Sequence, residues 1–258
     1  MSRKIVCTGR GGTGKTTFAA LAARYLDSHP LIIDADSDQN LADMLGVDLQ
    51  EEGIKTISDV LFDIQKHKDK GLESFPLPQR IEYLINESCI YESENFDIIS
   101  IGVKWTKGCY CFPNNVLRTI IPTMAKSYEY TIVDSPGGLE HLNRRIISDI
   151  DDVFVILDPS KKALNNVERM KKIASEIDIH FKNIYLVADH RFSSSAEEYV
   201  QSMKEKYVGK IDYDKNIEEY IWSGKSLLEL PEDSPAFSSV TKILTKAGFK
   251  TRVNCLKC

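Results

Sequence analysis

Short runs of apolar and often β-branched residues alternate along this chain with longer stretches in which apolar positions recur at helical spacing. Such short runs, bounded by polar or glycine-containing segments, are typical of buried strands. The pattern predicts strands near residues 4–8, 31–34, 97–101, 130–134, 152–157, 183–188 and 208–212, with helices between most of them. We therefore expect an α/β fold, a mostly parallel twisted sheet with helices on both faces.

The same pattern indicates how the chain is divided. The segment 51–94 is more polar, carries Pro76 and Pro78, and predicts surface helices before the sheet resumes. After Gly248 the helical periodicity is lost. We predict a single domain over residues 1–248 and a C-terminal tail over residues 249–258.

Composition narrows the class of protein. The chain has 258 residues, of which 42% are hydrophobic and 28% charged, enough for the core of one α/β domain. A formal net charge of −5 argues against a general nucleic-acid binder, which needs a basic face. No apolar run approaches the length of a membrane span, roughly 20 residues, and no signal segment precedes the first strand. We expect a cytoplasmic protein that binds neither nucleic acid nor membrane.

A glycine-rich loop carries the clearest chemistry. Residues 9–17 read GRGGTGKTT and fit the phosphate-binding pattern GxxxxGK(S/T) at every required position. A predicted strand precedes the loop and a predicted helix, residues 16–26, follows it, which is the required context. Loop amides turn toward phosphates, and the helix N-terminus favours anionic oxygens. The predicted nucleotide-binding residues are Gly11, Gly12, Thr13, Gly14, Lys15, Thr16 and Thr17.

Individual roles follow from this pattern. Lys15 would reach the β- and γ-phosphates, and the Thr16 hydroxyl would bind Mg²⁺. Asp134 ends a predicted buried strand and would bring a carboxylate to the edge where open α/β sheets bind ligands. We expect Asp134 to support the magnesium site, with ATP and Mg²⁺ as the ligands.

An acidic segment after the second predicted strand suggests which group of P-loop proteins this is. Residues 34–40 read DADSDQN and resemble the DxDxxxN segment of the MinD, ParA and nitrogenase-iron-protein ATPases, which have a deviant Walker A loop, KGGxGK(S/T). The resemblance implies that Asp36 positions or activates the attacking water, and that Asp34 and Asp38 support it or the metal. Asp38 is thus a second candidate for Mg²⁺. A solvated acidic turn is the alternative.

Further motifs resemble one branch of this group. Residues 134–138, DSPGG, are similar to the DSPAG of MinD, and residues 138–142, GLEHL, resemble the GxEHL of the CooC-type nickel-insertion ATPases. Cys109 and Cys111, before a predicted helix at 114–125, match the CxC of the same proteins. The resemblance continues more weakly through residues 158–160 and 235–236, so it spans essentially the whole chain. It implies an ATPase that acts as a homodimer.

Two positions depart from the pattern. Arg10 stands where the group has the lysine that crosses the dimer to the partner's nucleotide; arginine keeps the charge, so we retain Arg10 among the catalytic candidates. Asp189 stands where the family often has an asparagine that reads the base. A carboxylate accepts hydrogen bonds but does not donate them, so the preference for adenine is implied by the family and not by Asp189. His190 is expected to be an ordinary residue at a strand end.

The CxC pair suggests a metal site at a dimer interface. Zinc, nickel and a 4Fe-4S cluster each want about four ligands, so Cys109 and Cys111 would need their symmetry mates to complete a site. The alternative is a pair of ordinary surface thiols. His141 is either a further ligand or a structural residue.

The remaining cysteines are less informative. Cys255 and Cys258 form a terminal CxxC, whose spacing suits a metal relay but also an unconstrained tail. Cys7 and Cys89 are expected to be small buried apolar residues.

Three functions therefore compete. The first is an ATP-dependent metallochaperone that holds a metal, nickel by family, at the CxC pair and passes it to a client enzyme of carbon monoxide dehydrogenase or acetyl-CoA synthase type. The second is an ATP-driven iron–sulfur reductase that resembles the nitrogenase iron protein. The third is a positioning switch of the MinD/ParA kind, which is disfavoured by the acidic chain and by the lack of a basic amphipathic C-terminal helix.

Overall fold

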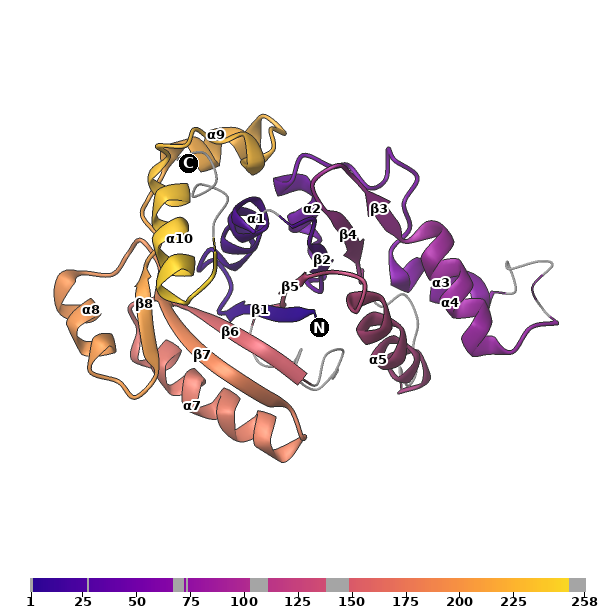
Figure 1. Ribbon diagram of the computed structural model, residues 1–258, viewed down its shortest axis with the longest axis horizontal. Helices are drawn as coiled ribbons and strands as arrows, with labels where there is room; N and C mark the ends of the chain where they lie inside the picture. Colours follow the sequence, from indigo (N-terminus) through magenta and orange to yellow (C-terminus); the bar gives the residue numbers. More distant parts are fainter. Residues whose placement is uncertain are drawn as a thin grey trace.

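The structure is a computed structural model that describes residues 2–26, 28–66, 72, 74–102, 111–137 and 149–250, without the side chains of 111–117. One twisted sheet runs through this part of the chain, with helices packed on it (Figure 1). Among the described residues, no helix is both long and apolar enough to cross a membrane.

Within the described residues, the sheet has eight strands in the order β3-β4-β2-β5-β1-β6-β7-β8. Every pairing is parallel except that of β3 with β4, which is antiparallel. This confirms the expected α/β fold. The strands are β1 (Arg3–Gly9), β2 (Leu31–Asp34), β3 (Ile90–Glu92), β4 (Asp97–Ser100), β5 (Tyr130–Asp134), β6 (Asp149–Leu157), β7 (His180–Ala188) and β8 (Lys206–Lys210).

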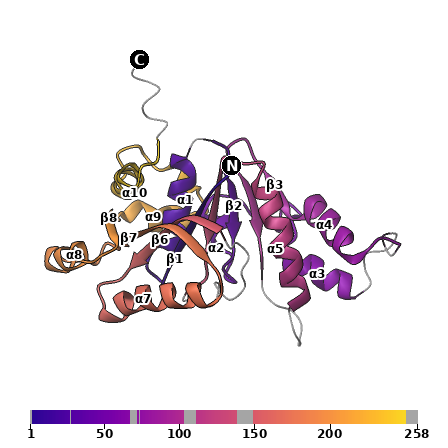
Figure 2. The same cartoon turned by 60° about the horizontal axis from the view of Figure 1, so that its bottom comes forward.

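Two apolar cores lie on opposite faces of the sheet, because successive side chains of a strand point to opposite sides. In β1, Ile5 and Cys7 face the core under α1, α2 and α10, whereas Val6 faces the core under α3, α4, α5, α7 and α8. Figure 2 shows α7 and α10 on the two sides of β6 and β7. The helices are α1 (Lys15–Tyr25), α2 (Asn40–Met44), α3 (Ile57–Gln65), α4 (Leu77–Ser88), α5 (Cys111–Ala125), α7 (Lys161–Glu176), α8 (Ser194–Gln201), α9 (Lys215–Trp222), the 3-10 helix η1 (Leu227–Glu229) and α10 (Pro235–Lys246).

The polar segment 51–94 differs in part from its prediction. It does form two helices, but α3 buries a full apolar face of four residues, and Ile81 and Ile85 of α4 are buried with it. The four residues of α3, at helical spacing, are Ile57, Val60, Leu61 and Ile64. The segment also contains the short strand β3, which sequence analysis missed because only three residues pair there.

The packed chain continues past Gly248. Phe249, assigned above to the tail, is buried with its ring centroid 6.1 Å from that of Tyr130 and 5.9 Å from that of Phe154. The guanidinium of Arg3 lies 3.7 Å from the same ring centroid. Phe249 therefore belongs to the core under α1 and α10, while residues 251–258, including Cys255 and Cys258, lie outside the described residues.

Candidate nucleotide site

The glycine loop connects the end of β1 to the start of α1. Gly12 and Gly14 have φ angles of 72° and 87°, in the left-handed region that favours glycine. A Cβ atom built on Gly11, Gly12 or Gly14 would meet no atom within 4 Å, so the loop borders open space. Gly9 is different, because a Cβ there would lie 2.3 Å from the Ile156 carbonyl oxygen of the neighbouring strand. The loop is thus closed against the sheet on one side and open to a ligand on the other.

The start of α1 offers donors to an anion. Gly14 precedes the helix and, within the described structure, no side chain caps the first turn, so its backbone N–H groups stay available for a phosphate. Lys15 is buried, and Thr13 is held in place by a hydrogen bond from its Oγ1 to the Arg10 carbonyl, 2.9 Å long. A cation and open amides at one helix terminus fit the phosphates of a nucleotide.

Asp134 lies at the centre of this edge, at the end of β5. It pairs in register with Cys7 of β1 and Asp34 of β2, and its side chain is fully buried. Both of its carboxylate oxygens lack a hydrogen-bond partner among the described residues. Burial raises the pKa of Asp134 to about 6, and the nearby positive charge of Lys15 opposes this rise. A buried carboxylate without partners is costly unless a cation binds it, so its oxygens and the Thr16 hydroxyl fit Mg²⁺.

Asp34 orders the acidic turn that follows β2. Its Oδ1 accepts a hydrogen bond from the Asp36 amide and its Oδ2 one from the Leu41 amide, each 3.1 Å long. Burial, together with the nearby charge of Asp134, raises the pKa of Asp34 to about 7. Asp34 therefore holds the backbone of residues 36–41 in place, and its support of the metal or the water stays a prediction.

The other two acidic residues of the turn lie further out. Asp36 is half-buried and its Oδ1 accepts a hydrogen bond from the Asp38 amide, 3.3 Å long. Asp38 is exposed to solvent. Asp36 is therefore the carboxylate of this turn that is both near the sheet edge and accessible to a water molecule.

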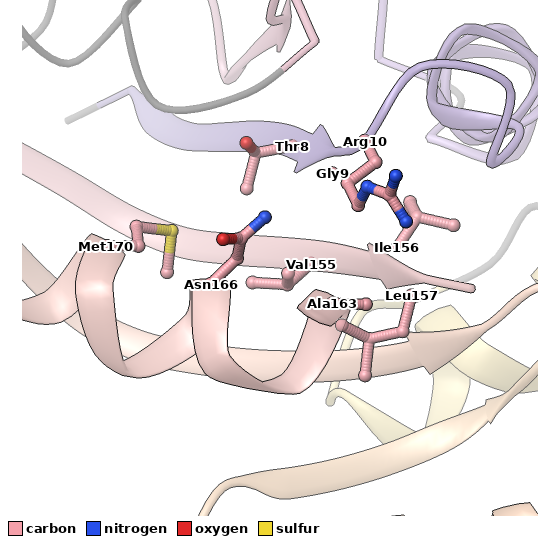
Figure 3. Close-up of a pocket in the computed structure, with 9 residues that line it drawn as sticks. All are labelled: Thr8, Gly9, Arg10, Val155, Ile156, Leu157, Ala163, Asn166 and Met170. Carbon is pink, nitrogen blue, oxygen red and sulfur yellow. The ribbon is translucent and has the colours of Figure 1, made fainter. Parts of the chain in front are cut away.

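Arg10 is bound within its own chain. Its Nη1 donates to Asp158 Oδ2 at 2.7 Å and to Ser160 Oγ at 3.3 Å, both just after β6. Figure 3 shows the Arg10 side chain at the end of β1, over the last residues of β6. The Arg10 side chain is 39% exposed, and its guanidinium is held by Asp158 rather than extended away from the molecule.

A cleft on the other side of the loop is the candidate base pocket. Asp189, directly after β7, is buried at its wall and accepts hydrogen bonds from Arg191. The His190 ring packs against the Tyr213 ring, with centroids 5.5 Å apart. The cleft is lined by Gly12, Thr13, Gly14, Thr17, Asp189, His190, Ile211, Asp212, Tyr213, Asp214, Ile217 and Glu218.

Comparison with known proteins decides the family. The family model AAA_31, described as an AAA domain, matches residues 3–187. This chain belongs to that family of P-loop ATPases, of ParA and MinD type. An uncharacterized ATP-binding protein of Methanocaldococcus jannaschii is 34% identical over 94% of this chain and 97% of its own. The carbon monoxide dehydrogenase accessory protein CooC of Rhodospirillum rubrum is 24% identical over 90% of this chain and 91% of its own. The MinC:MinD complex of Aquifex aeolicus contains the same fold, with a TM-score of 0.67, 19% identity and 96% of each chain covered.

The structure of this ATPase brings two more residues to the site: Gly137, from the DSPGG segment identified in the sequence, and Arg191, which sequence reasoning missed. A Cβ atom on Gly137 would lie 3.2 Å from the Gly11 amide nitrogen, so the segment after β5 touches the phosphate loop. Arg191 Nη2 donates to the Gly12 carbonyl at 3.4 Å. The feature of the sequence that could have identified Arg191 is its place two positions after Asp189, the carboxylate that follows β7.

The metal-binding prediction of this ATPase falls mostly outside the described residues. Cys109 and His141 are among the residues that are not described, and Cys111 begins α5 without a described side chain. Within the described ranges, no group of three or more His, Cys, Asp or Glu side chains could hold a metal ion. Cys7 and Cys89 are buried as expected, and burial raises the pKa of both thiols.

Proposed function

We propose that this ATPase is a metallochaperone that carries nickel on Cys109 and Cys111 and delivers it to an enzyme of carbon monoxide dehydrogenase or acetyl-CoA synthase type. The observation that carries the proposal is the match to the Rhodospirillum rubrum accessory protein CooC over nine-tenths of the chain, 90%. The CxC pair, which lies after β4 in the sequence and ends at the first residue of α5, supports it.

The chemistry of the cargo site requires two copies of the chain. Two thiolates supply half of the roughly four ligands that nickel or zinc takes. A two-fold axis through the CxC segment would supply the other half from the same residues of the partner. A homodimer is therefore part of the proposal, and nickel is its substrate rather than a resident cofactor.

A short chain of contacts supports coupling between nucleotide and cargo. Ser100 ends β4, pairs in register with Asp34 of β2, and donates from its Oγ to Gln39 Oε1 at 3.3 Å. The acidic turn and the strand that leads into the CxC segment are thus joined directly. A change in the turn on hydrolysis would be transmitted along β4 toward Cys109.

In the proposed hydrolysis, the loop amides and Lys15 bind the phosphates and neutralise their charge. Mg²⁺, when bound, supplies further positive charge at the phosphate oxygens, with Thr16 and Asp134 as its protein groups and Asp38 as the outer candidate. Asp36 orients the attacking water by accepting its hydrogen bond. Positioning and charge neutralisation account for most of the catalysis in such a reaction.

In this scheme, Arg10 contacts the nucleotide of the partner subunit once the dimer has formed. To reach the nucleotide of the partner subunit, its guanidinium has to leave Asp158 and Ser160. Dimer formation would then exchange an ion pair within one chain for a contact with the partner's phosphates.

Metal content tests the proposal. Protein purified without oxygen is incubated with Ni²⁺, with and without ATP, and its metal content and mass in solution are measured. We expect about one nickel per dimer, lost in Cys109→Ser with Cys111→Ser while ATP still binds. Cys255→Ser with Cys258→Ser is the matched control and should keep the metal.

The same purified protein distinguishes the metallochaperone from the two alternative functions. About four irons with matching sulfide would instead make the protein an ATP-driven reductase. ATP-dependent sedimentation with liposomes or DNA, with no metal bound, would make it a positioning switch. Unchanged nickel content in the Cys109 and Cys111 variant would overturn the cargo site.

A further inference from the structure

Gln39, at the end of the acidic turn, has an unusual backbone conformation. Its φ and ψ angles are 53° and 33°, in the left-handed region that residues other than glycine, asparagine and aspartate seldom occupy. Such a conformation persists only where the surrounding contacts hold it, and it is found most often at functional sites. The contacts that hold Gln39 therefore show what the conformation is for.

The left-handed conformation of Gln39 closes the acidic turn. Asp34 accepts a hydrogen bond from the Asp36 amide with one carboxylate oxygen and from the Leu41 amide with the other. The chain has to reverse between residues 36 and 41 for both amides to reach one side chain, and Gln39 is the residue of this stretch with a positive φ. Its own amide donates to the Asp36 carbonyl at 3.4 Å. The backbone of Gln39 thus helps to set where Asp36 lies.

A buried hydroxyl outside the turn holds the Gln39 side chain. Ser100, the last residue of β4, is 1% exposed and donates from its Oγ to Gln39 Oε1 at 3.3 Å. Within the described residues, this is the one hydrogen bond that the Gln39 side chain makes. Ser100 is itself fixed, because it pairs in register with Asp34 and the next amide, of Ile101, donates to the Asp34 carbonyl at 2.8 Å. The turn is therefore anchored to β4 at its far end.

We propose that Gln39 is a positioning residue for ATP hydrolysis, with Ser100 as its anchor. The bond from Ser100 offsets the cost of the left-handed backbone and so keeps the acidic turn closed. The closed turn holds the Asp36 carboxylate where it orients the attacking water, so this inference rests on the role proposed above for Asp36. A small displacement of a positioned group is enough to slow a reaction.

Glycine separates the backbone conformation of Gln39 from its side-chain contact. Ser100→Ala removes the hydrogen bond and leaves a glutamine in an unfavourable conformation. Gln39→Ala has the same two consequences, because alanine also disfavours a positive φ. Gln39→Gly loses the bond as well, yet glycine adopts the left-handed conformation at no steric cost. If the closed turn is what matters, glycine at position 39 should rescue the loss of the Ser100 hydroxyl.

Steady-state hydrolysis of ATP by the full-length chain tests the proposal. Rates are measured with Mg²⁺ and without nickel, at protein concentrations where the rate per chain no longer rises. Ser100→Ala and Gln39→Ala should each lower kcat about tenfold and change KM for ATP less than about twofold, since the contact acts on the turn and not on the phosphate loop. Gln39→Gly should recover most of kcat, alone and combined with Ser100→Ala.

A second left-handed residue provides the matched control. Asp178 has a φ of 54° and lies at an exposed turn before β7, at the edge of the sheet opposite the phosphate loop. Asp178→Gly relaxes the same backbone conformation and should leave both kcat and KM unchanged. Melting temperatures of all variants are measured above the assay temperature, so that a lower rate is assigned to folded protein.

Asp36→Ala distinguishes this inference from the role of Asp36 itself. That variant should be slow, and adding Ser100→Ala to it should slow it no further, because both act through one carboxylate. If Asp36→Ala hydrolyses ATP like the wild type, the proposed role of Asp36 is wrong and the positioning role of Gln39 is wrong with it. If Asp36→Ala is slow while Ser100→Ala keeps the wild-type kcat, or if Gln39→Gly is no faster than Gln39→Ala, only the positioning role is overturned.

Discussion

Arg10 and Asp158 form an ion pair across the strands β1 and β6, with Arg10 Nη1 2.7 Å from Asp158 Oδ2. Arg10 occupies the place of the residue that the family resemblance sends across the dimer, yet here it is bound within one chain. Its release is therefore a step that the proposed cycle requires.

Replacing Asp158 tests that step. In Asp158→Ala, Arg10 loses its partner, so dimerisation with ATP and hydrolysis should both become faster. The pair is partly exposed and contributes on the order of 1 kcal/mol or less, which corresponds to a gain of up to about fivefold. Hydrolysis rates measured over a range of protein concentrations check this, because the gain should be largest where dimers are scarce.

Two further variants show whether Arg10 is responsible. Arg10→Ala alone should slow hydrolysis, and adding Asp158→Ala to it should produce no recovery. A slower rate in Asp158→Ala alone would mean that the ion pair supports the active conformation instead of restraining it.

The unpartnered carboxylate of Asp134 predicts opposite effects on activity and stability. Asp134→Asn should lower the rate of Mg²⁺-dependent hydrolysis by about 100-fold or more, since an amide is a poor ligand for Mg²⁺ compared with a carboxylate. The nucleotide-free protein should become more stable, because a buried carboxylate that has no hydrogen-bond partner among the described residues has been removed. Chemical denaturation and steady-state rates check the two effects, and Asp233→Asn, at an exposed position, is the control.

The raised pKa of Asp134 also predicts how stability depends on pH. Its carboxyl has a pKa of about 6 in the folded chain against 3.8 when unperturbed, so the folded state binds more protons between these values. Stability therefore falls as pH rises through this window, by about 3 kcal/mol at about 1.4 kcal/mol for each pKa unit. Asp34, with a pKa of about 7, extends the fall to higher pH.

Melting temperatures of the nucleotide-free, EDTA-treated protein check this from about pH 5 to pH 8. We expect the wild type to melt higher at the acidic end, and the difference between it and Asp134→Asn to grow as pH rises. A wild-type melting temperature that rises across this range would contradict the burial of an unpaired carboxylate.

Much of this site could be predicted because its chemistry is local in sequence. Residues 9–17 specify a loop between a strand and a helix, and the positive φ angles of Gly12 and Gly14 are what such a loop needs. Seven of the eight described strands were predicted because each contains a short apolar run, and Asp134 was identified because it ends one.

The remaining features depend on contacts distant in sequence. Nothing near Arg10 indicates that Asp158, 148 residues away, holds it, because that contact exists only once β1 and β6 pair. The motif of Asp34 indicates a role at the metal or the water, and only the fold shows that each of its oxygens also accepts a hydrogen bond from an amide of the turn. A sequence pattern gives the types of residue and their spacing, whereas the partner of each polar side chain depends on the fold.

The last prediction concerns Phe249, which the sequence pattern assigns to the C-terminal tail and which the structure places in the apolar core. Loss of periodicity after Gly248 indicates a tail, yet Phe249 is only 4% exposed, and its ring packs against Tyr130 and Phe154 and under the Arg3 guanidinium. Phe249→Ala should therefore destabilise the protein by about 3–5 kcal/mol, as expected for a buried aromatic residue. Tyr199→Ala, at a site 62% exposed, should cost far less in the same denaturant titration. Equal small effects of both substitutions would show that the chain stops contributing to the core at Gly248, and that the sequence boundary was the physical one.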